Sequence, residues 1–129
     1  MVMSFELKPT LKTPHVVVDD ATGNVLIAGI SIPEDPYSFY ADFTEELTKL
    51  LNASPESLNF EFKLEYYNTS STLMIRNILS LLAENNHKTK ILVKWYYENY
   101  DEDMKIAGEE FSSLFEPLDF SLIGINEFS

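Results

Sequence analysis

Cysteine is absent from the 129 residues, so disulfide bonds, thiolate metal sites and thiol nucleophiles are all excluded. The sequence also lacks a glycine-rich phosphate loop, a Gly-x-Ser-x-Gly elbow and a His-Glu-x-x-His helix. Its two histidines, His15 and His87, stand at a predicted strand start and in a polar turn, where surface histidines are common. We therefore expect a protein that is not an enzyme and that uses no cofactor and no metal.

Long apolar runs are lacking as well. No segment approaches the roughly 20 apolar residues that a membrane-spanning helix needs. Residues 1–13 lack the basic start, apolar run and small-residue cleavage site of an export signal. These features predict a cytoplasmic protein.

Basic residues are few, with 9 Lys and Arg against 21 Asp and Glu, which gives a formal net charge of −12. A charge of this sign repels phosphate backbones and anionic lipid headgroups, so nucleic acid and membrane surfaces are not expected partners. A basic protein surface stays open as a partner, although solubility alone explains such a charge.

Hydrophobic residues make up 45% of the sequence and charged residues 23%, which is typical of a globular domain. A chain of this length builds one core but not two independent ones. No repeat, low-complexity segment or linker interrupts it. We predict a single domain over residues 1–129.

Periodic apolar residues, separated by proline and polar breaks, divide the chain into strands and helices. After a polar leader, the expected strands are His15–Asp19, Val25–Ser31, Leu58–Tyr66, Lys90–Tyr97 and Phe120–Ile125. The expected helices are Tyr37–Asn52, Thr72–Asn85 and a third that Asp101 caps and that ends near Phe115. The order β-β-α-β-α-β-α-β predicts an α/β domain in which about three helices cover a mixed sheet.

The segment Tyr66–Thr72 places four hydroxyl residues between the end of a strand and the start of a helix. A helix begins with unpaired N–H groups and a partial positive charge, so a hydroxyl there accepts a hydrogen bond. A phosphate attached to such a hydroxyl meets the same donors and the same dipole. The pattern is compatible with an ordinary helix cap, Thr69 included, and with a phosphorylation site.

Several motifs, in order along the chain, resemble the SiaC family of bacterial regulatory phosphoproteins, which is related in fold to STAS-type anti-sigma factor antagonists. The resemblance covers roughly Thr13 to Ile123. The matching segments are Thr13-Pro14, Ile32–Pro36 with Phe39-Tyr40, Lys63–Ser71, Val93–Tyr97, Glu102–Met104 and Gly108–Phe111.

The resemblance implies that Thr69, in the Asn-Thr-Ser-Ser motif, is phosphorylated by a partner serine/threonine kinase and dephosphorylated by a phosphatase. The unphosphorylated form would bind and activate a target, such as a diguanylate cyclase that raises cyclic di-GMP and promotes biofilm formation. The neighbouring motif residues are Tyr67, Asn68, Ser70 and Ser71. We expect Ser70 and Ser71 to be mainly structural in the first helical turn, and Asn68 to orient the loop.

Two other hypotheses about function are compatible with the sequence. One is an enzyme or small-ligand binder that uses a pocket at the carboxyl ends of the strands, where open α/β sheets commonly place ligands. The other is a constitutive adaptor whose hydroxyl cluster serves only as a cap.

Overall fold

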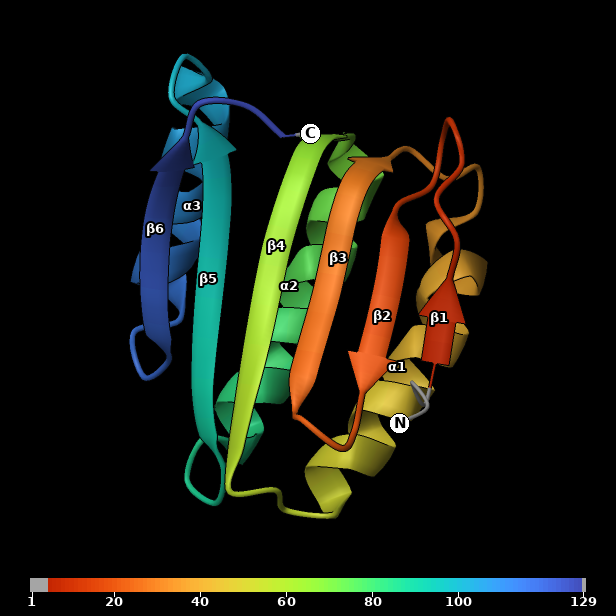
Figure 1. The fold of residues 1–129 in the computed structure, drawn as a ribbon, viewed down its shortest axis with the longest axis vertical. Helices are drawn as coiled ribbons and strands as arrows, with labels where there is room; N and C mark the ends of the chain where they lie inside the picture. Colours follow the sequence, from red (N-terminus) through yellow and green to blue (C-terminus); the bar gives the residue numbers. More distant parts are fainter. Residues whose placement is uncertain (1–4, 129) are drawn as a thin grey trace.

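The computed structural model describes residues 5–128, which form one six-stranded sheet and three helices. The strands are β1 Phe5–Leu7, β2 His15–Asp19, β3 Asn24–Ser31, β4 Ser57–Tyr67, β5 Lys90–Glu98 and β6 Asp119–Ile125. The helices are α1 Pro36–Asn52, α2 Thr69–Asn85 and α3 Glu102–Leu114. The spatial order of the strands is the same as their order in the chain (Figure 1).

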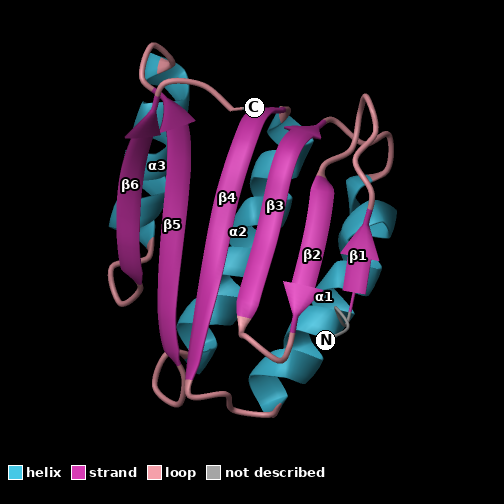
Figure 2. Cartoon of the chain, viewed as in Figure 1, coloured by secondary structure: helices cyan, strands magenta, loops and turns pink. Residues whose placement is uncertain are grey.

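All three helices lie on one face of the sheet, behind it in Figures 1 and 2. Strands β1, β2 and β3 are antiparallel neighbours, whereas β3, β4, β5 and β6 are parallel and are joined by α1, α2 and α3. Each parallel connection steps to the next strand in the same direction, so right-handed crossovers bring every helix to the same side. The domain has two layers, and no described helix covers the second face of the sheet.

The core fills the space between the sheet and the helices. Trp95 is fully buried at its centre, and its indole Nε1 donates to the carbonyl of Met104 on α3 over 3.0 Å. This bond satisfies the one polar atom of a large buried side chain and ties β5 to α3. Other fully buried large side chains are Ile27, Phe43, Leu47, Leu51, Leu58, Phe60, Phe62, Leu64, Ile75, Leu79 and Leu82.

The predicted fold class, a mixed sheet covered by three helices, is confirmed, and the predicted order is confirmed from His15 onward. The prediction of a polar leader is wrong at Phe5–Leu7, which forms β1 and pairs with Val16–Val18 of β2. Three residues are too few to produce a periodic signal, and this edge strand depends on its neighbour. Residues 1–4 of the leader and residue 129 lie outside the described part.

A β-bulge changes the direction of the side chains at the end of β4. Gly29 of β3 pairs with Leu64, but the next residue, Ile30, pairs with Tyr66, so Glu65 is an extra residue on β4. Regular alternation would place Tyr66 in the core with Leu64. Instead Tyr66 is 57% exposed and Tyr67 turns inward. Gly29 adopts φ 106°, which few other residues tolerate, beside this irregularity.

Gly108 allows α3 to approach the sheet closely, and Gly108→Ala tests this contact. An added Cβ would lie 2.5 Å from an indole carbon of Trp95 and 2.6 Å from a methyl of Leu122. Alanine favours an isolated helix by about 1 kcal/mol, but overpacking a core typically costs about 1–3 kcal/mol. We expect a net decrease in the free energy of unfolding, measured by urea denaturation. Ser113→Ala, at an exposed position of α3, should change it by less than about 0.5 kcal/mol.

Candidate functional site

The amino-terminal ends of α1, α2 and α3 meet at one edge of the sheet, where β3, β4 and β5 end (Figure 1). Each helix has a side-chain cap: Asp35, Asn68 and Asp101 accept hydrogen bonds from backbone N–H groups three residues later, at 3.0–3.1 Å. The positive ends of three helix dipoles are therefore gathered at this edge. Open parallel sheets place functional groups at the same location.

Asn68 caps α2. Its Oδ1 accepts a hydrogen bond from the N–H of Ser71 over 3.0 Å and one from the hydroxyl of Ser70 over 3.2 Å. Because of this cap, the helix starts at Thr69, three residues earlier than predicted. The alternative in which Thr69 itself caps the helix is wrong, since Thr69 is the first helical residue. Asn68, expected to orient the loop, does so by capping.

Ser71 is fully buried in a chain of hydrogen-bonded hydroxyl groups. Its hydroxyl donates to the carbonyl of Ser31 at the end of β3 over 2.9 Å, and its oxygen lies 2.9 Å from the hydroxyl of Ser31. Since each hydroxyl has one proton, Ser31 must donate to Ser71, and Tyr40 of α1 must donate to Ser31 over 2.7 Å. Burial raises the pKa of Tyr40 to about 12, which keeps this donor protonated. The chain ties α1, β3 and α2 together.

The predicted site residues are exposed to very different degrees. Thr69 and Ser70 lie at the surface, and Ser71 is inside. Tyr67 packs edge-on against Trp95, with ring centroids 6.2 Å apart. Burial, followed by the nearby Glu110 carboxylate, raises the pKa of Tyr67 to about 12. Ser71 and Tyr67 therefore have structural positions, and Thr69 and Ser70 present their hydroxyl groups at the edge.

Three large side chains on the elements that start or end at this edge of the sheet are exposed and were not predicted as part of the site. Leu73 is 44% exposed and follows Thr69 by four residues, so the two share a face of α2. Tyr66 is 57% exposed at the end of β4, and Tyr37 is 62% exposed in the first turn of α1. The bulge that exposes Tyr66 does not change the alternation of apolar residues along β4, so sequence patterns do not predict it.

No described helix is long and apolar enough to cross a membrane. Among residues 5–128, no group of three or more His, Asp or Glu side chains is arranged to hold a metal ion. What the edge of the sheet presents is a pair of hydroxyl residues on a firmly anchored helix start, bordered by apolar side chains.

Exposed hydroxyl groups at a helix start lie where a phosphate would meet backbone N–H donors and the positive end of the helix dipole. The chain belongs to the SiaC family of regulatory phosphoproteins, whose family model matches residues 7–125. An uncharacterised protein of Pseudomonas aeruginosa (strain UCBPP-PA14) is 28% identical over 103 residues, which are 79% of this chain and 82% of that protein.

Two crystal structures from Pseudomonas aeruginosa have the same fold. One contains the diguanylate cyclase SiaD in complex with its activator SiaC; the matching chain has a TM-score of 0.88 and 24% identity, with 95% of this chain and 100% of that chain covered. The other is apo-SiaC, with a TM-score of 0.85 and 24% identity, covering 95% of this chain and 99% of that chain.

Removing the hydroxyl of Ser71 tests how firmly the start of α2 is anchored. Ser71→Ala deletes the bond to the Ser31 carbonyl and leaves the buried Ser31 hydroxyl without its acceptor. We expect the free energy of unfolding to fall by about 1–3 kcal/mol in urea denaturation. Ser70→Ala removes a hydroxyl one position away at the surface and should change it by less than about 0.5 kcal/mol. Equal effects of the two substitutions would contradict the assigned anchoring role.

Proposed function

We propose that this chain is a phosphorylation-controlled, protein-binding regulator in the bacterial cytoplasm, and that Thr69 is the residue modified. A serine/threonine kinase adds the phosphate and a phosphatase removes it. The unphosphorylated form binds and activates a target protein. Membership of the SiaC family and the fold shared with the SiaC chain bound to SiaD support a diguanylate cyclase as that target.

The freedom of the Thr69 hydroxyl is the observation that carries this assignment. Within residues 5–128 the Thr69 hydroxyl makes no hydrogen bond, whereas the Ser70 hydroxyl donates to Asn68 and the Ser71 hydroxyl is buried. A kinase can reach Thr69 without breaking a bond or opening the helix. Phosphorylation of Ser71 would require the hydroxyl chain to come apart, so Ser71 is not an acceptor.

The local backbone is suited to a phosphate at Thr69. The N–H groups of Ser71 and Thr72 already bond to the carbonyl of Asn68, which leaves those of Thr69 and Ser70 without an intrahelical acceptor. A phosphate brings acceptor oxygens and about −1.5 to −2 charges to the positive end of the helix dipole. Phosphorylation should therefore leave the helix folded and stabilise its first turn.

The same charge would prevent a close-fitting partner from binding. Leu73 presents apolar surface on the same face of α2 as Thr69, and a target that covers Leu73 would also cover the Thr69 side chain. A hydroxyl can be buried there when a group of the partner forms a hydrogen bond with it, but a buried phosphate dianion without a cationic partner is strongly unfavourable. The modification thus acts on the binding surface and not on the fold.

The position of the phosphate can be tested directly. The purified protein is incubated with ATP and a serine/threonine kinase from the same organism, and peptides spanning residues 66–76 are analysed by mass spectrometry. We expect one phosphate on Thr69 and none after Thr69→Ala, whereas Ser70→Ala should be modified like the wild type. An active kinase that leaves this peptide unmodified would exclude Thr69 and favour the constitutive adaptor.

The effect of the phosphate on binding is a separate test. We expect phosphorylated protein to bind a diguanylate cyclase from the same organism at least about tenfold more weakly than unphosphorylated protein or Thr69→Ala, measured by isothermal titration calorimetry. Amide hydrogen exchange of α2 should show equal or greater protection after phosphorylation. Melting of α2 would contradict a mechanism that acts through the surface alone.

A further inference from the structure

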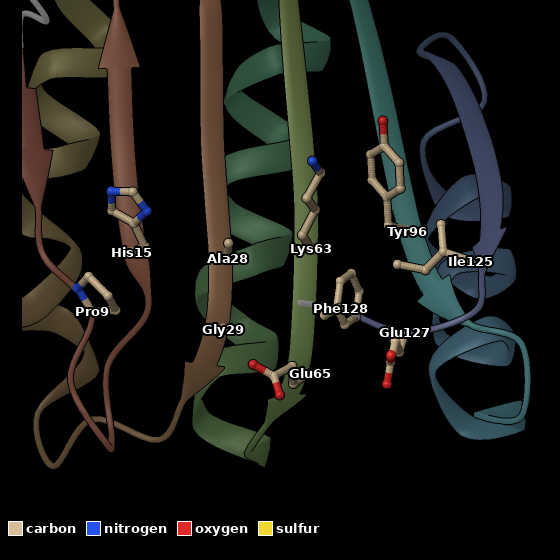
Figure 3. Close-up of a pocket in the computed structure, with 10 residues that line it drawn as sticks. All are labelled: Pro9, His15, Ala28, Gly29, Lys63, Glu65, Tyr96, Ile125, Glu127 and Phe128. Carbon is tan, nitrogen blue, oxygen red and sulfur yellow. The ribbon is translucent and has the colours of Figure 1, made fainter.

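The face of the sheet without helices contains a cavity of about 410 Å³ near the carboxyl ends of the parallel strands (Figure 3). Its volume lies within the range of small-molecule sites, about 300–1,000 Å³. It differs from the Thr69 site in its lining residues and in the face of the sheet that it uses.

Small residues on β3 create this hollow. Ala28 is paired in register with His15 of β2 on one side and with Lys63 of β4 on the other. A methyl group therefore lies between two long side chains on adjacent strands, and Gly29 continues the low floor. An added Cβ at Gly29 would make an ordinary van der Waals contact with the Cα of Pro14, at 3.9 Å.

Aromatic side chains form walls on the other side of the hollow. Tyr96 stands on β5, and Phe128 lies across the sheet because the chain after β6 turns back (Figures 1 and 3). The return is held by bonds from the N–H of Phe128 to the Glu98 carboxylate over 3.1 Å and from the N–H of Asn99 to the Ile125 carbonyl over 2.8 Å. The cavity therefore has fixed walls.

The cavity is lined by groups of both charges that are not paired with one another. The ammonium of Lys63 lies 4.8 Å from the ring centroid of Tyr96 and forms no ion pair with a described carboxylate. Glu65 and Glu127 likewise have no basic partner within residues 5–128. His15 uses Nε2 for a 2.7 Å contact with Glu6, and its other ring nitrogen points toward Ala28 (Figure 3).

These opposite charges are separated along the strands. In Figure 3, the ammonium of Lys63 lies on one side of the cavity, and the carboxylates of Glu65 and Glu127 lie nearer the strand ends. A purely anionic ligand would face two carboxylates, and a purely cationic one would face the lysine. A molecule that carries both charges can satisfy both sides.

We propose that this cavity binds a small zwitterion of the α-amino-acid type. Its carboxylate would face the ammonium of Lys63, its ammonium would face Glu65 and Glu127, and an apolar side chain would contact Tyr96 and Phe128. The site is independent of Thr69 and adds a small-molecule binding function to the regulator.

Amino acids and their blocked analogues test this assignment on the full chain. The 20 standard L-amino acids are titrated one at a time into ¹⁵N-labelled protein, and amide shifts are followed by NMR. We expect at least one to give saturable shifts at Ala28, Gly29 and Lys63. Its N-acetyl and carboxamide derivatives, which each lack one charge, should bind at least about tenfold more weakly.

Three variants locate the bound molecule. Ala28→Leu fills the hollow without changing a charge and should abolish the shifts, and Lys63→Met should weaken binding at least about tenfold while leaving the hollow open. Lys94→Met removes a lysine from the same face outside the cavity and should bind normally. Well-dispersed NMR spectra establish that each variant is folded.

The proposal is overturned if no amino acid in the panel gives saturable shifts. It is also overturned if a blocked derivative binds as well as its parent, or if the folded Ala28→Leu protein retains binding. None of these results would bear on phosphorylation of Thr69, which the kinase experiment decides separately.

Discussion

The constraint on which the whole arrangement depends is the handedness of the three crossover connections. Each of them steps to the next parallel strand in the same direction, so a right-handed path puts α1, α2 and α3 on one face. One consequence is that three helix starts, with their caps and dipoles, gather at a single edge of the sheet. The other is that the opposite face stays bare. The proposed phosphorylation site lies at that edge and the proposed amino-acid cavity lies on that face, so the positions of both follow from the topology.

The buried chain of hydroxyl groups of Tyr40, Ser31 and Ser71 determines which hydroxyl groups at the start of α2 are available for modification. Ser71 and Thr69 are two residues apart in one helical turn, but the Ser71 hydroxyl is bonded to Ser31, whereas the Thr69 hydroxyl has no hydrogen bond within residues 5–128. Burial of a hydroxyl is tolerated only when its hydrogen bonds are satisfied, and here Tyr40 and Ser31 satisfy them. A regulator needs its modifiable residue on a helix start that is held in place. The chain of hydroxyl groups holds the start of α2 against β3 and α1.

The fold class could be predicted because it depends on local patterns. Alternation in Leu58–Tyr66 and the spacing of apolar residues in Tyr37–Asn52 identified a strand and a helix from nearby residues alone. The start of α2 was placed three residues late because a run of hydroxyl residues is a weak helix signal, although the capping ability of Asn68 can be read from the sequence.

Features that depend on distant residues could not be predicted. The burial of Ser71 requires Ser31, forty positions earlier, and the inward turn of Tyr67 requires a bulge opposite Gly29. The hollow at Ala28 exists only because strand pairing places it between His15 and Lys63. The motif points to the segment that contains Thr69, but only the tertiary structure distinguishes its four hydroxyl groups from one another.

The extra residue at Glu65 has a consequence for how surfaces diverge among related proteins. Side chains on a strand alternate with period two, so one inserted residue exchanges the inner and outer positions of everything that follows until the strand ends. Here the exchange affects two adjacent tyrosines. The residue type at the surface is therefore unchanged, but a different tyrosine is exposed. A relative without the inserted residue could keep both tyrosines and expose to its partners the one that packs inward here. In such a family, the length of this strand would be a better guide to the contact surface than the identity of the residues in it.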